Sequence, residues 1–89
     1  MERSIETKHN NKKGSRQEWK DKDRAIKTRS TNVLRQLARH NSEFVRLAVI
    51  FNPNIEKNPD VLIDIIRKDP VINLRETALA MLQRIRKLQ

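Results

Sequence analysis

Short stripes of apolar residues at helical spacing recur along the chain after Asn32. Residues at positions i, i+1, i+4 and i+5 share one face of a helix. This spacing occurs in Val33, Leu34, Leu37 and Ala38, and again in Val61, Leu62, Ile65 and Ile66. Within the first stripe, the polar residues Arg35, Gln36 and Arg39 point away from the apolar face. The pattern therefore predicts two short amphipathic helices with charged outer faces.

Two broader apolar patterns predict helices after Ser42 and towards the C-terminus. The first has Val45, Ala48 and Val49 at its centre, widened by Phe44, Leu47 and Phe51. Such breadth indicates a helix that is covered on more than one side. The main seam of the last helix comprises Leu74, Ala78, Met81, Ile85 and Leu88. Leu79 and Leu82 lie off that seam.

Polar residues and prolines mark where these helices begin and end. Asn58-Pro59-Asp60 combines a cap, a proline at the first helical position and a carboxylate beside the positive end of the dipole. Ser42, and either Thr31 or Asn32, are predicted N-caps, and Asn73 with Glu76 has the spacing of a capping box. Asn52-Pro53-Asn54 and Asp69-Pro70 predict turns. The apolar stripes are therefore separate helices.

The N-terminal third of the chain has a different composition. Residues 1–15 contain two isolated aliphatics, Met1 and Ile5, and no period, so they cannot offset their ordering entropy, and we expect a disordered basic tail. A helix is predicted from Arg16 to Arg29, with Trp19 and Ile26 seven residues apart on one face. This helix would be thinly amphipathic, with a strongly basic remaining face.

The helices after Asn32 repeat one another. The stripe from Val33 matches the stripe from Val61 at an offset of 28, and Val45-Arg46-x-x-Val49 matches Leu74-Arg75-x-x-Ala78 at an offset of 29. A self-similar period in this range is typical of a solenoid. We expect an all-α helical repeat domain over residues 16–89, with units at about 32–58 and 59–89. The Trp19 helix would be an N-terminal half-unit and the last helix a C-terminal cap.

These residues carry a family resemblance. Val45-Arg46-Leu47-Ala48-Val49, followed by Asn52-Pro53-Asn54 and then by Pro59-x-Val61-Leu62, is similar to the leucine-rich repeat variant family over roughly residues 32–80. The resemblance implies a short right-handed solenoid like those of HEAT and armadillo proteins, and a role in interaction without catalytic residues. The link from Ile55 to Pro59 is longer than usual. The iron–sulfur cluster of some members needs cysteines, and this chain has none.

Composition narrows the function classes. The 89 residues carry 20 Lys or Arg against 11 Asp or Glu, a formal net charge of +9, and this balance favours polyanionic partners. The absence of cysteine excludes disulfides and thiolate metal sites. No apolar run is long enough to cross a membrane, and the basic N-terminus lacks the apolar region of a secretory signal. We therefore expect a soluble cytoplasmic protein with no membrane partner.

The titratable residues do not form a pattern that predicts catalysis. His9 lies in the expected tail and His40 at the end of a helix, where solvation or the helix dipole accounts for each. Asp60 and Asp64 lie four residues apart, but a metal ion needs more oxygen ligands than two. With Gly14 as its only glycine, the chain cannot form a glycine-rich phosphate loop. We expect no enzyme activity, cofactor or metal.

Two functions stay open at this point. The first is a non-catalytic protein–protein interaction or regulatory module. Its candidate docking residues are the apolar side chains outside the main seams, namely Ile63, Leu79 and Leu82. The alternative for these residues is burial against a neighbouring helix, and self-association through such a face is a further option.

The second function is nucleic-acid binding through the phosphate backbone, led by the basic arm and first helix. Its candidate residues are Lys12, Lys13, Arg16, Lys20, Arg24, Lys27 and Arg29. The equivalent pairs Arg39 and Arg67, and Arg46 and Arg75, would add a basic ladder along the repeat. The alternative is a solubilising arm and arginines paired with Glu43, Asp64 or Glu76. Aromatic side chains that could stack on bases are nearly absent.

Overall fold

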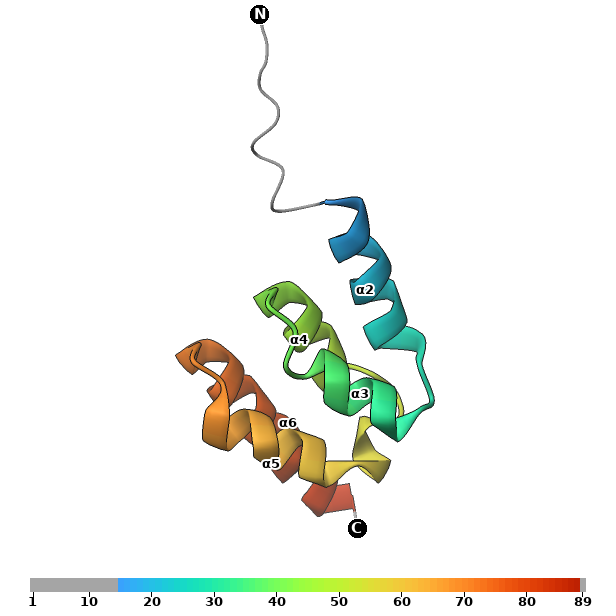
Figure 1. Cartoon of the computed structure of the whole chain (residues 1–89). Coiled ribbons are helices and arrows are strands. Elements are labelled where there is room, and N and C mark those ends of the chain that lie inside the picture. The colour runs from blue at the N-terminus through green and yellow to red at the C-terminus, as the bar shows by residue number, and fades with distance from the viewer. Residues whose placement is uncertain (1–14, 89) are drawn as a thin grey trace, which may run out of the picture.

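The computed structural model describes residues 15–88, and every regular element in this range is helical. The elements are α2 (Arg16–Lys27), α3 (Thr31–Leu37), α4 (Glu43–Ile50), the 3₁₀ turn η2 (Ile55–Lys57), α5 (Pro59–Lys68) and α6 (Ile72–Leu88) (Figure 1). The predicted all-α class is confirmed. Residues 1–14 of the predicted tail lie outside the described residues.

The helices after α2 form two antiparallel pairs that lie side by side. In Figure 1, α3 and α5 lie in front, and α4 and α6 lie behind them. We call α3 with α4 the first helix pair and α5 with α6 the second helix pair. Helix α4 packs against α2 on one side and α6 on the other, while α5 packs closely against α6. The middle helix α4 is therefore covered on several sides, as its broad apolar pattern predicts.

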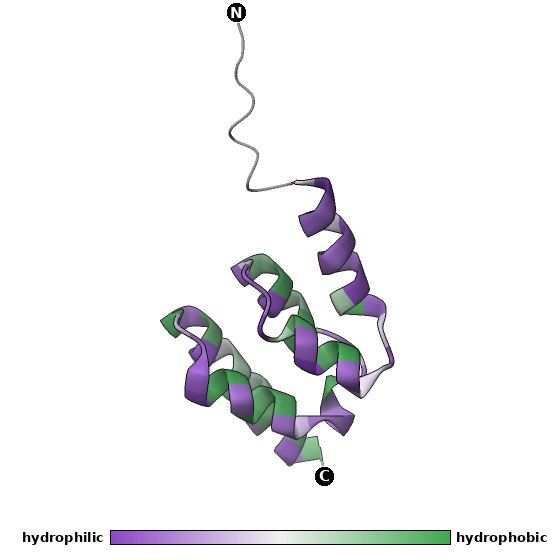
Figure 2. Ribbon diagram, viewed as in Figure 1, coloured by the Kyte–Doolittle hydropathy of each residue, from purple (hydrophilic) through white to green (hydrophobic). Residues whose placement is uncertain are grey.

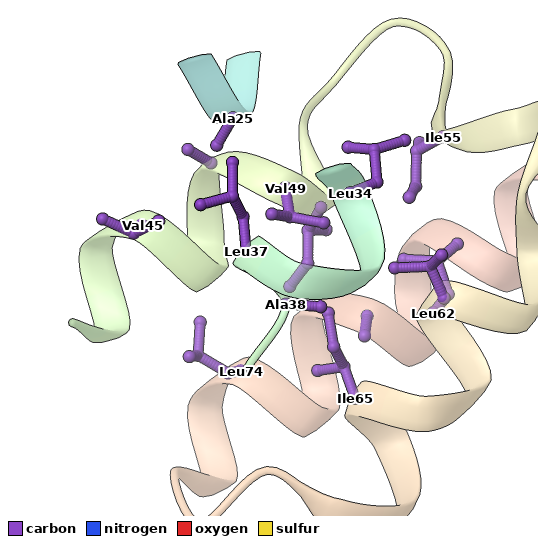
Figure 3. Close-up of a cluster of buried hydrophobic side chains, with 14 of the residues drawn as sticks. Ala25, Leu34, Leu37, Ala38, Val45, Val49, Ile55, Leu62, Ile65 and Leu74 are labelled. Carbon is purple, nitrogen blue, oxygen red and sulfur yellow. The ribbon is translucent and has the colours of Figure 1, made fainter. Parts of the chain in front are cut away.

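The core lies between the helix pairs and follows the predicted stripes. Leu34 and Leu37 of α3, with the C-cap residue Ala38, lie near Leu62 and Ile65 of α5 (Figure 3). They belong to one buried cluster that also includes Val61 and residues of α4 and α6. Val33 and Ile66 lie at the margin and are partly buried. At the offset of 28, Leu34 and Leu62 are both buried, as are Leu37 and Ile65, whereas the two flanking positions of each stripe differ in burial between the helices.

Helix α2 contributes little to this core. Of its apolar residues, Ala25 is buried, whereas Trp19 is 59% exposed and Ile26 is also exposed. Figure 2 shows α2 as hydrophilic along most of its length. The expectation that Trp19 and Ile26 form its packed face is wrong, because α2 is joined to α4 mainly by polar contacts. The helix ends at Lys27, two residues earlier than expected, because Thr28 is extended.

The buried face of α6 also differs from the predicted seam. Leu74, Ala78 and Ile85 are buried as expected, but Leu82 is buried too, with 5% exposure, and Leu88 is exposed. Because α6 packs against both α4 and α5, its buried face is rotated toward Leu82 and away from Leu88. The assignment of Leu82 to an exposed docking surface is therefore wrong.

Three of the described helices begin at a serine whose side chain caps the first turn. Ser42 caps α4 as predicted, while Ser30, one residue before the predicted Thr31, caps α3. Ser15, assigned to the tail, instead caps α2 by accepting from the Glu18 backbone. Each hydroxyl accepts an amide hydrogen that the first helical turn leaves without a partner.

Two asparagines predicted as caps do not bond through their side chains to the helices they were expected to cap. Helix α5 begins at Pro59 as predicted, but the Asn58 side chain bonds to Thr31 and to the Asn54 carbonyl, and not to its own helix. Asn73 lies inside α6, which begins one residue earlier. The side chain that bonds to this N-terminal turn is Asp69, whose Oδ1 accepts from the Val71 amide at 2.9 Å.

Candidate interaction surface

A buried arginine joins the two helix pairs at the end where their turns lie. Arg46 of α4 is 7% exposed. Its Nε and Nη2 donate to the two carboxylate oxygens of Asp69 at 2.7 and 3.3 Å. Its Nη1 donates to the carbonyls of His40 and Asn41 at 2.7 and 3.1 Å. The guanidinium therefore binds the α3–α4 turn and the α5–α6 turn at once, with its charge matched by a buried carboxylate.

The second helix pair repeats part of this arrangement. Arg75 of α6 donates from Nη1 to the Asp69 carbonyl at 2.7 Å, six residues back, as Arg46 does to His40. Likewise, His40 Nδ1 accepts from the Ser42 amide and Asp69 Oδ1 accepts from the Val71 amide, each two residues ahead and at 2.9 Å. The offset of 29 is thus a match of contacts as well as of residue types.

Exposed ion pairs link α3 to α5. Arg35 contacts Asp60 at 2.8 Å and Arg39 contacts Asp64 at 3.5 Å. Both arginines are largely exposed, so each pair contributes about 0–1 kcal/mol. Along the groove between the two turns, Arg39 and Arg46 face Asp64 and Asp69. Each arginine of the first helix pair therefore has a carboxylate partner in the second.

This pairing changes the predicted basic ladder. Arg46 does not join an open cationic face, because it is paired with the buried Asp69, whereas Arg39 is exposed and shares Asp64 with Lys68. The expectation that Arg46 lies on the surface is wrong, since it is buried. Arg67 is exposed and Arg75 is half-buried. The pairing expected for Arg39 with Asp64 is present.

The other candidate residues lie in distinct places. Leu79 is 44% exposed, and Ile63 is partly buried against the core. The candidate basic residues of the N-terminal helix and its following link are all exposed: Arg16, Lys20, Arg24, Lys27 and Arg29. Lys27 pairs with Asp23 at 3.0 Å. Lys12, Lys13 and His9 lie outside the described residues.

A polar network that the sequence did not predict holds α2 on α4. His40 Nδ1 accepts from the Ser42 amide, which places the proton of the neutral ring on Nε2, where it donates to Asp21 Oδ2 at 2.8 Å. This hydrogen bond lowers the pKa of the Asp21 carboxyl below its usual 3.8. The Ser42 hydroxyl bonds to Glu18. His40 and Ser42 are thus engaged in capping and docking contacts, and the ring does not face the hydroxyl as a base.

Asn52 supplies the other fixed point for α2. Its side chain is buried, and its Nδ2 donates to the carbonyls of Ala25 and Thr28 at 2.7 and 2.9 Å. Its Oδ1 accepts from the Asn54 amide at 2.6 Å. A signal for this role exists in the Asn-Pro-Asn turn, but its distant partners are not visible in the sequence.

An exposed aromatic cluster covers the junction of α2 and α4. The Lys22 Nζ lies 4.7 Å from the centre of the Trp19 ring and 5.9 Å from that of Phe44. At exposed sites such cation–π contacts contribute about 0.5–1 kcal/mol each. Lys22 therefore shields part of both rings.

Between Ser15 and Leu88, no group of three or more acidic or histidine side chains is placed to hold a metal ion, and no helix has the length and apolarity to cross a bilayer. Comparison with family models, curated proteins and solved structures gives no match. The family resemblance thus stays an expectation.

Proposed function

We propose that this chain is a non-catalytic protein–protein interaction module built on a short, right-handed, HEAT-like helical repeat. The observation that carries the proposal is the repeated contact of Arg46 with His40 and of Arg75 with Asp69. Helical units that repeat in this way stack through their faces, and they use outer and end surfaces for binding. The repeat therefore supports a scaffold that presents side chains to a partner.

Charge and exposure support a protein partner with an acidic surface. The chain carries a formal charge of +9, and apolar side chains such as Ile72 and Leu79 are exposed on α6. A partner that supplies carboxylates beside aliphatic groups would match both features.

The proposal is tested by affinity purification of the full chain from the cells that produce it, with and without nuclease. We expect a protein that remains bound after nuclease treatment and dissociates at high salt. Complete loss of co-purifying protein after nuclease treatment would reject the proposal.

A second candidate, nucleic-acid binding, is favoured by the row of exposed cations on α2. Arg16, Lys20 and Arg24 follow at spacings of four residues, which places them along one side of the helix. This function predicts retention on duplex DNA or RNA at low salt, and a decrease of the salt slope when Lys20→Glu and Arg24→Glu are combined. Arg84→Glu with Arg86→Glu is the matched control, since both residues are exposed on α6. An unretained wild-type chain would exclude this candidate.

A further inference from the structure

At the equivalent repeat positions, the second helix pair carries two arginines and an aliphatic residue, as the first pair does where it lies against the second. At the offset of 28, Arg67 of α5 is the counterpart of Arg39. At the offset of 29, Arg75 and Leu79 of α6 are the counterparts of Arg46 and Ile50. We call Arg67, Arg75 and Leu79 the outer face.

Both arginine counterparts in the first helix pair are bound by the second, and the aliphatic counterpart is buried. Arg39 pairs with Asp64, and Arg46 is bound in a bidentate manner by Asp69. Ile50 is 0% exposed, in the helix that packs against α6. The first pair thus accepts two carboxylates that are five residues apart, with the buried aliphatic Ile65 between them.

The outer face lacks such a covering among residues 15–88. Leu79 is nearly half exposed and Arg67 is exposed. Within this described range, the one hydrogen bond of the Arg75 guanidinium is from Nη1 to the Asp69 carbonyl, so Nε and Nη2 are available. The same Nε and Nη2 atoms of Arg46 are the ones that bind Asp69.

We infer that the outer face docks an acidic segment of another protein in which a helix ends in a turn, with one carboxylate in the helix and a second five residues later at its C-cap, as Asp64 and Asp69 are placed in α5, and with an aliphatic residue between them. This inference rests on the proposed function and names its surface and partner chemistry. One carboxylate binds Arg75 through Nε and Nη2, the other pairs with Arg67, and the aliphatic residue covers Leu79.

Charge argues against two other occupants. A symmetric contact with a second copy would bring each outer face onto itself, and like charges at Arg67 and Arg75 would repel. A nucleic-acid backbone would match the two arginines but would leave the exposed Leu79 without an apolar partner.

The test is photo-crosslinking of the full chain in the cells that produce it. A photoreactive phenylalanine analogue replaces Leu79. Mass spectrometry then identifies the attached peptide. We expect a helical segment of another protein with two acidic residues at the stated spacing. Arg67→Glu with Arg75→Glu should reduce the yield about tenfold, because two contacts become repulsive. Arg84→Glu with Arg86→Glu should leave it unchanged.

An adduct with a second copy, with nucleic acid or with a basic segment would overturn the inference, as would an unchanged yield in the reversed variant. Circular dichroism checks that this variant is helical, and Arg67→Gln with Arg75→Gln replaces it otherwise. If affinity purification still recovers a protein partner with the reversed variant, the surface is wrong but the proposed function stands. If no protein partner is recovered at all, both fail.

Discussion

We call the contact of Arg39 and Arg46 with the second helix pair, together with the buried Ile50, the inner join. The inner join and the outer face of the second pair use similar residue types in different surroundings. Arg46 is buried and bound to a carboxylate at the inner join, whereas its counterpart Arg75 is half-buried and, among residues 15–88, bonds only to its own turn. Ile50 is fully buried, whereas its counterpart Leu79 is exposed. The comparison teaches that a repeat position specifies what a side chain can contact, while the neighbouring element decides whether it is buried.

The energetic consequences of the two positions differ accordingly. A buried ion pair has lost its water, so removing one partner leaves a desolvated charge without compensation. A surface arginine keeps most of its hydration and loses little when it is removed. The comparison therefore predicts unequal effects for matched substitutions at the two places.

The largest difference is expected between Arg46→Ala and Arg75→Ala. The first substitution leaves Asp69 charged and buried, which should lower the free energy of unfolding by about 3–5 kcal/mol. The second should lower it by about 1 kcal/mol or less. Urea unfolding followed by circular dichroism measures both. Equal effects would show that the inner join is not distinct.

The next difference concerns the apolar counterparts. Ile50→Ala removes a fully buried side chain and should lower the free energy of unfolding by about 2–5 kcal/mol. Leu79→Ala, at an exposed position, should change it by about 0.5 kcal/mol or less. Urea titration measures the free energy of unfolding of both variants. A large decrease for Leu79→Ala would show that Leu79 is a core residue.

A smaller effect is expected at the join between α2 and α4, which is polar. Asn52→Ala removes the donor for two carbonyls and should lower the free energy of unfolding by about 1–3 kcal/mol. Amide hydrogen exchange should show the loss of protection concentrated in α2, with α5 and α6 little affected. Asn54→Ala, which removes one longer contact of 3.3 Å to Thr28, is the control. A uniform loss over all helices would contradict a separately held α2.

The smallest effect is a pH dependence at the same join. Because the pKa of Asp21 is lowered in the folded chain, its ionised form stabilises the fold above the usual 3.8. That stabilisation is lost as the pH falls through the lowered folded pKa. The stability difference between wild type and Asp21→Asn should therefore be greatest near neutral pH and shrink in acid. If the stability difference between wild type and Asp21→Asn grew in acid instead, the hydrogen bond from His40 would not stabilise ionised Asp21 in the folded chain.

The helices could be predicted from the sequence because their apolar spacing is local. Leu34 and Leu62 are buried as their stripes predict. The rotation of α6 that buries Leu82 could not be predicted, because it depends on the simultaneous contact of α6 with two helices. Trp19 was misassigned because α2 is joined through polar groups, which leave no apolar period.

Candidate site residues were harder to place because their partners are distant in the chain. The equivalence of Arg46 and Arg75 was visible in the sequence, but the partner of Arg46, Asp69, lies 23 residues away in another turn. Nothing local indicates which carboxylate a guanidinium will meet. In contrast, the pair of Arg39 with Asp64 was among the expected pairings.

Thiol labelling of the single-cysteine variant Leu79→Cys tests the outer face most directly, because the natural chain contains no cysteine. The account predicts rapid labelling of the purified protein and slow labelling inside the cells that produce it. Arg86→Cys, at an exposed position, should label rapidly in both settings. Arg67→Glu with Arg75→Glu should restore rapid labelling of Leu79→Cys in the cell. Equal labelling of Leu79→Cys in the two settings would contradict the claim that a partner covers this face.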